Sequence, residues 1–163
     1  MEITVRLKSY ELLYDIGNIA FITGDIMLQD VKLQSAVQDV VNDGNVDKVT
    51  RSLSRIFNEL VSSLTAYTKK ELIENVVVSD DLTAPENYEV VLVVPDTFSS
   101  PNANAVVTAA HDYMVNMALS DWFSITKKDE AQMYFDKAMN ELSKINSYMI
   151  KRTRRMRRKG SPF

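Results

Sequence analysis

The chain has 163 residues, of which 45% are apolar and 25% are charged, values that predict a single globular domain with a core of its own. It contains no cysteine, which excludes disulfides and thiolate chemistry, and no apolar run approaches the length needed to cross a bilayer. We therefore expect a soluble protein without a secretory signal or a membrane partner, folding in a reducing cytoplasm. The net charge of −3 is unevenly distributed along the chain. Seven of the 19 cations lie in residues 151–159, so residues 1–150 contain 12 cations and all 22 acids and carry a net charge of about −10.

The first part of the chain predicts one strand and then three helices. Apolar and polar residues alternate from Ile3 to Leu7, which indicates a short strand or an extended arm. Helical spacing of apolar residues predicts helices over residues 9–24, 30–42 and 46–67. We expect Ser9 to cap the first helix, Gly44 to give the second a left-handed end, and Asn45 to cap the third. The first helix has a broad apolar face that should be buried, made of Leu12, Leu13, Ile16, Ile19, Ala20 and Phe21.

The pattern changes from helical to extended in the middle of the chain. Two runs rich in β-branched residues, Val76–Val78 and Tyr88–Val94, flank a segment with turn-forming Asp, Pro and Asn. This arrangement predicts an inserted β-hairpin over roughly residues 72–95. Alternate residues of its second strand are apolar on both faces, so a partner should cover one of them. We expect an assembly interface there, at Val91, Leu92 and Val93, with the C-terminal Phe163 as a further contact.

Two helices close the chain. The first, over residues 101–124, is apolar almost all round and should be central and buried. The second, over residues 127–153 with Thr126 as its N-cap, has a stripe for packing on the first, formed by Ala131, Phe135, Ala138, Leu142, Ile145 and Met149. The short connection favours an antiparallel pair. The sequence thus predicts a mainly α fold, a bundle of about five helices with an inserted hairpin in residues 1–150, and a basic C-terminal arm in residues 151–163.

Few residues suggest catalysis or metal binding. His111, the single histidine, lies beside Asp112 and is either an acid–base group or a polar position on a helix; we favour the second, because no other histidine or nucleophile motif accompanies it. Asp80 and Asp81 fit a solvated loop better than a site for a hard cation. Three aromatic residues have the spacing of a core rather than of a ligand box: Trp122, Phe123 and Tyr134. We expect no enzyme activity, no cofactor and no metal.

The basic arm is the strongest polar signal in the sequence. Its cations are Lys151, Arg152, Arg154, Arg155, Arg157, Arg158 and Lys159. A solvated helix end is the alternative interpretation, but compensation of a helix dipole needs one or two cations, not seven. Nucleic-acid phosphate or an acidic protein surface is therefore the expected partner, and the absence of interleaved aromatic residues argues against stacking on single-stranded bases.

The chain resembles the small structural proteins of the head-to-tail connector (adaptor or head-completion) type that tailed bacteriophages and prophages encode. The likeness rests on His111-Asp112-Tyr113-Met114-Val115, Leu119-Ser120-Asp121-Trp122, Ser124-Ile125-Thr126, the region Ala131–Ala138, and the basic run closing on Ser161-Pro162-Phe163. It covers mainly residues 105–163 and contains no signature motif.

The resemblance implies a helical subunit without enzyme activity. Such subunits form a homo-oligomeric ring beneath the portal, around the DNA channel, in contact with portal and with tail or neck proteins. The expected location is the virion, at the head–tail junction, after synthesis in the host cytoplasm. Two alternatives stay open: a tail-completion or tail-terminator protein, and a nucleic-acid-binding regulator that uses the basic arm, although no recognition helix is evident.

Overall fold

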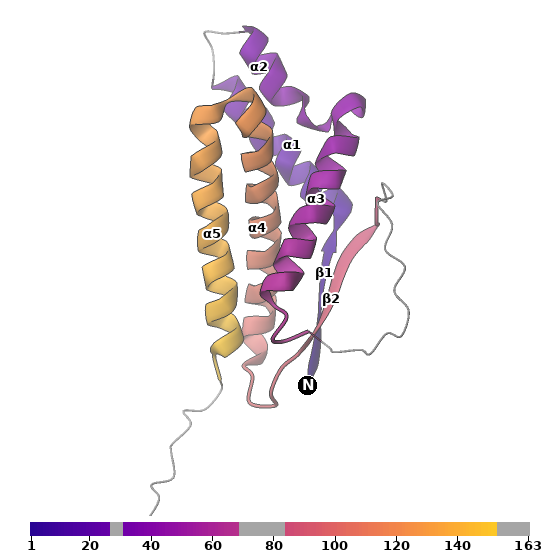
Figure 1. Cartoon of the computed structure of the whole chain (residues 1–163), viewed down its shortest axis with the longest axis vertical. Helices are drawn as coiled ribbons and strands as arrows, with labels where there is room; N and C mark the ends of the chain where they lie inside the picture. Colours follow the sequence, from indigo (N-terminus) through magenta and orange to yellow (C-terminus); the bar gives the residue numbers. More distant parts are fainter. Residues whose placement is uncertain (27–30, 69–83, 153–163) are drawn as a thin grey trace, which may run out of the picture.

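The computed structural model describes residues 1–26, 31–68 and 84–152. In these residues the fold is mainly helical with five α-helices, as the sequence predicted, and it contains one antiparallel pair of strands (Figure 1). The elements in chain order are β1 (Glu2–Lys8), α1 (Ser9–Asp25), α2 (Val31–Gln38), the 3-10 helix η1 (Asp39–Val41), α3 (Asp43–Ser63), β2 (Asn87–Val93), α4 (Ser100–Thr126) and α5 (Lys128–Ile150).

Helix α4 is the centre of the molecule, as its apolar residues on all sides predicted. It lies between α5 and α3 and packs also against α1, α2 and β1 (Figure 1). Pro101 stands in its first turn, where the missing N–H costs no helical hydrogen bond. Lys127 alone separates α4 from α5, so the two long helices run antiparallel.

The packing side of α5 differs in part from the predicted stripe. Ala138, Ile145 and Met149 are buried as expected, Ala131 and Leu142 are partly buried, and Tyr134 completes the contact. Phe135 was wrongly placed in the stripe, because 39% of it is exposed. A helical pattern gives the centre of an apolar face but does not show how far round the helix the neighbouring element reaches.

Three expected helix ends are also corrected by the structure. Thr126 is not the N-cap of α5: its hydroxyl donates to the Trp122 carbonyl, 3.1 Å away, inside the last turn of α4. Gly44 lies within the first turn of α3 and has no positive φ, so it ends no helix. The Asn45 side chain donates to the Asp39 carbonyl at 2.9 Å instead of capping α3, which begins at Asp43.

Ser9 begins α1 without capping it. Its hydroxyl donates to the Pro85 carbonyl and its backbone N–H donates to the Glu86 carbonyl at 3.0 Å. The side chain that was expected to close a helix end therefore fastens the start of α1 to the segment that leads into β2.

The two strands come from distant parts of the chain. β1 pairs antiparallel with β2, with Ile3 opposite Leu92 and Leu7 opposite Tyr88. Their inner face adds to the core, whereas the other face carries polar residues and exposed valines. The predicted strand Tyr88–Val94 is thus present as β2, while Val76–Val78 lies outside the described residues.

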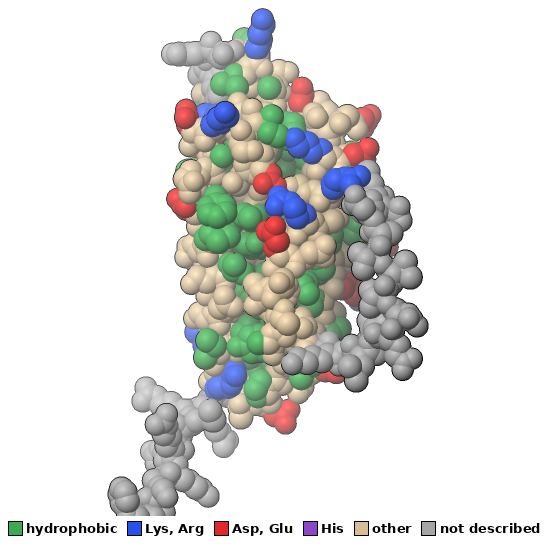
Figure 2. All heavy atoms as spheres, viewed as in Figure 1, with side chains coloured by type: hydrophobic (Ala, Val, Ile, Leu, Met, Phe, Trp, Pro, Cys, Tyr) green, Lys and Arg blue, Asp and Glu red, His purple; other side chains and the backbone are tan. Residues whose placement is uncertain are grey.

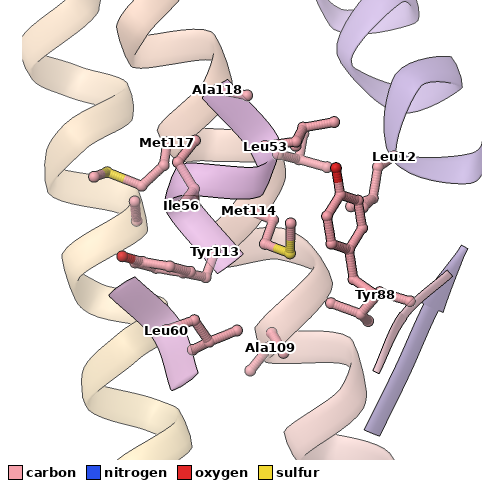
Figure 3. Close-up of a cluster of buried hydrophobic side chains, with 14 of the residues drawn as sticks. Leu12, Leu53, Ile56, Leu60, Tyr88, Ala109, Tyr113, Met114, Met117 and Ala118 are labelled. Carbon is pink, nitrogen blue, oxygen red and sulfur yellow. The ribbon is translucent and has the colours of Figure 1, made fainter. Parts of the chain in front are cut away.

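The core joins α3, α4 and the strands. Figure 3 shows Leu53, Ile56 and Leu60 of α3 on the same cluster as Met114 of α4, with Tyr88 of β2 at its edge. The aromatic residues expected in the core are there: Trp122, Phe123 and Tyr134 are buried, and the Phe123 ring lies 5.1 Å from that of Tyr134. Among the described residues, these buried side chains form one continuous core.

Candidate interaction surfaces

The outer side of α1 carries three exposed aromatic residues, here called the aromatic face: Tyr10, Tyr14 and Phe21. They are 62%, 70% and 56% exposed. Spacings of four and seven residues put them on one stripe of the helix, because 3.6 residues make a turn. Phe21 was wrongly predicted to be buried; Leu12, Ile16 and Ala20 make the buried side of α1 instead. The spacing of Tyr10, Tyr14 and Phe21 is the signal in the sequence that indicates this face.

Two glycines allow α1 to pack closely against α2 and η1. A Cβ on Gly17 would lie 3.0 Å from a Val41 methyl carbon, and one on Gly24 would lie 2.6 Å from Cγ of Gln38. The Gln38 amide also donates to the Phe21 carbonyl at 3.2 Å. The inner side of α1 is thus closely packed, and only its outer side is available to a partner.

The aromatic face is set among negative charges. α1 contains Glu11, Asp15 and Asp25 but no lysine, arginine or histidine. The Tyr10 hydroxyl donates to the Glu11 carboxylate at 2.8 Å, and this hydrogen bond lowers the pKa of Glu11, with a smaller contribution from Lys8. Glu11 is therefore ionised at neutral pH.

The single histidine pairs with a residue of another helix. His111 Nε2 lies 2.8 Å from Asp15 Oδ2, so the pair ties α4 to α1, and the neighbouring Asp112 plays no part in it. The pair lines an open hollow of about 320 Å³ together with Arg6, Leu7, Lys8, Glu11, Val107 and Thr108. In the described ranges there is no group of three or more potential metal ligands. A carboxylate partner is compatible with both interpretations of His111, the polar position on a helix and the acid–base group.

The expected interface on β2 splits between two faces. Leu92 is fully buried against the core, which corrects its assignment as a surface contact, because its side chain points to the inner face. Val91 and Val93 point outward and are 36% and 43% exposed. Their strand also receives a contact on its second edge, where the Val93 N–H donates to the Tyr67 carbonyl at 2.6 Å.

Only the first two cations of the basic arm lie in the described part of the chain. Lys151 Nζ stands 4.7 Å from the centre of the Tyr148 ring, and the Arg152 guanidinium donates to the Met149 carbonyl at 2.8 Å. The backbone of Arg152 also forms a bridge with Phe98. These contacts fix where the arm begins, at the end of the molecule where the N-terminus lies (Figure 1). Arg154, Arg155, Arg157, Arg158, Lys159 and Phe163 lie outside the described residues.

The face formed by α3, α4 and α5 shows mixed charges rather than one sign. In Figure 2, basic and acidic side chains lie beside one another toward α3, and hydrophobic side chains gather over α5. Arg55 of α3 pairs with Glu59 at 3.1 Å and with Asp121 of α4, which also accepts a hydrogen bond from Ser52. These charges join two helices of the same chain.

Comparison of the chain with models of protein families, with curated proteins and with solved structures gave no match. No described helix combines the length and the apolar character needed to cross a membrane. The structure thus defines a mainly helical protein with an exposed aromatic face on one helix, exposed valines on a strand pair, and a basic arm that begins at one end.

Proposed function

We propose that this chain is a non-enzymatic structural subunit that assembles with copies of itself into a ring at the head-to-tail junction of a tailed bacteriophage. The observation that carries the proposal is the aromatic face of α1. Three large aromatic side chains are exposed on a helix whose other side is fully packed, and exposed patches of this kind mark sites of macromolecular contact.

Two further features favour assembly of copies in a ring. The aromatic face, the outward valines Val91 and Val93, and the start of the basic arm belong to different elements. Contacts between unlike surfaces of identical subunits are heterologous, and they close into rings when the rotation permits. Symmetry would repeat each arm around the ring, which concentrates positive charge in a band suited to DNA phosphate or to acidic protein surfaces.

The resemblance to connector proteins supplies the place and the partners in this proposal. It favours contact with the portal on one side of the ring and with tail or neck proteins on the other. A tail-completion protein would assemble through the same surfaces but would bind the end of the tail. A nucleic-acid-binding regulator would use the arm on duplex DNA without forming a ring.

The test is the mass and shape of the purified protein, alone and with the portal protein of the same phage. Native mass spectrometry and electron microscopy should show closed rings of one stoichiometry, or ring formation on the portal. A chain that stays monomeric in both conditions would refute the proposal. Binding to isolated tails but not to portal would favour the tail-completion protein, and binding of one duplex sequence by monomers would favour the regulator.

A further inference from the structure

We infer that the aromatic face of α1 is the docking site for the basic arm of a second copy of this chain. The inference rests on the proposed self-assembly and names the two surfaces that meet. It replaces DNA phosphate with an acidic protein surface as the main partner of the arm.

The two segments are chemically complementary. Apart from Lys8 next to Tyr10, the outer side of α1 offers three aromatic rings with Glu11, Asp15 and Asp25 nearby, whereas residues 151–159 offer seven cations with no acid and no aromatic residue. Arginine guanidinium groups stack on aromatic faces and pair with carboxylates, so one arginine can use both features of α1. The arm thus carries the groups that this surface lacks.

Contacts between a cation and an aromatic ring already occur within the chain. Lys151 stands over the Tyr148 ring at 4.7 Å, and Lys137 stands over the Tyr134 ring at 4.5 Å. Just before α1, Lys8 lies 5.5 Å from the centre of the Tyr10 ring. Tyr14 and Phe21 have no such cation in the described part of the chain, and they are the positions that we assign to the arm of a neighbour.

The dimensions of the two segments agree. Tyr10 and Phe21 are eleven residues apart, or about 16 Å along the helix, while residues 151–159 reach about 30 Å when extended. Arginines three residues apart, such as Arg155 and Arg158, would stand about 10 Å apart in an extended arm. This spacing is close to the rise of about 10.5 Å between Tyr14 and Phe21, the two rings assigned to the arm.

The position of the arm favours a neighbour over the same chain. Figure 1 shows α1 in the half of the molecule near the α4–α5 turn, whereas α5 ends at the opposite end. α5 has 23 residues and a length of about 35 Å. An arm that docked on its own α1 would have to turn back along α5, whereas the arm of one subunit needs no such reversal to meet the α1 of the next.

Two complementary variants test the contact in the full-length protein. The face variant combines Tyr14→Gln and Phe21→Gln, and the arm variant combines R154Q, R155Q, R157Q and R158Q. Each variant alone should associate roughly tenfold more weakly than the parent chain or worse, measured by sedimentation. Mixed in equal amounts, they should form a one-to-one complex, because the intact arm of one still fits the intact face of the other.

The control and the outcomes separate this inference from the proposed function. Phe135→Gln changes an exposed aromatic residue on α5 and should leave association unchanged. If both variants still form rings, assembly stands and the arm–α1 contact is wrong. If the mixture stays monomeric, docking between subunits is wrong. Short duplex DNA could bind the parent and the face variant equally but not the arm variant, while the face variant still assembles. That result would show that the arm binds DNA phosphate and not α1.

A disulfide distinguishes a neighbour from the same chain. Because the protein contains no cysteine, Tyr14→Cys and Arg155→Cys introduced together give one defined pair. Oxidation should yield covalent multimers that do not form with Phe135→Cys in place of Tyr14→Cys. A crosslink that leaves the chain monomeric would show that the arm folds back on its own α1, and it would overturn the assignment to a second copy.

Discussion

The hydrogen bond between Trp122 and α2 allows a direct test of how the helices are held together. The indole Nε1–H donates to the Val37 carbonyl at 3.0 Å, and both residues are buried. Val37 stands in the last turn of α2, where carbonyl groups lack partners within an α-helix. Trp122→Phe would keep an aromatic ring in the core and remove this donor.

The expected cost has two parts. A buried carbonyl without a donor costs about 1–3 kcal/mol, and the volume lost between indole and phenyl adds to this, so we expect roughly 2–4 kcal/mol in the free energy of unfolding. For a chain of this size the melting temperature should fall by about 5–15 °C.

The effect of Trp122→Phe is measured by urea denaturation followed by far-UV circular dichroism. Tryptophan fluorescence cannot be used, because the variant loses the only tryptophan in the chain. Amide hydrogen exchange should rise more in α2 than in α5. Phe135→Leu, at an exposed position, is the control and should change stability by less than about 0.5 kcal/mol. A similarly small change for Trp122→Phe would refute the proposed tie between α2 and α4.

Three further predictions follow from burial and charge. Ile145→Ala should destabilise by about 2–5 kcal/mol, and Leu142→Ala by clearly less because Leu142 is only partly buried; equal losses in thermal unfolding would contradict the packing of α5. Leu92→Glu should abolish folding, while Val91→Glu should leave the circular dichroism spectrum unchanged; two folded variants would place β2 outside the core. Burial, with a smaller contribution from Glu141, raises the pKa of the Asp112 carboxyl. The folded state therefore binds this proton more tightly than the unfolded state, and the contribution of Asp112 lowers the free energy of unfolding as the pH rises above about 4. Asp112→Asn should therefore stabilise the protein at neutral pH, and the gain should vanish below about pH 3; a gain that is independent of pH would show that the charge is not its cause.

The long helices could be predicted because their pattern is local. The apolar residues of α4 on all sides indicated a central helix, and its observed range, Ser100–Thr126, extends the prediction by one or two residues at each end. The strand that became β2 was equally clear from its β-branched residues. Its pairing with β1 was not, because residues 79 to 91 positions apart meet there and no local signal specifies a distant partner.

Helix ends were the least predictable feature, for a physical reason. Ser, Thr and Asn have side chains that bond to whichever backbone group is nearest, and that group depends on the tertiary fold. Ser9 bonds to Pro85, which reaches it only because β1 and β2 pair. Asn45 bonds to Asp39 across the sharp connection between η1 and α3. The residue types were those expected at helix ends, while their partners were set by packing.

The aromatic face shows why an interaction surface requires both sequence and structure. A helical pattern identified Phe21 as apolar but assigned it to the core, because sequence alone does not distinguish the two sides of a broad apolar helix. The structure separates them: Ile16 and Ala20 fill the core, and Phe21 stays outside with Tyr14. Both rings lie outside the core that the described residues form, so burial in that core does not account for them. The residues of α1 itself include acids and no cation, and this complementarity to the basic arm is the reason that we infer the arm of a second copy as the cover of these rings.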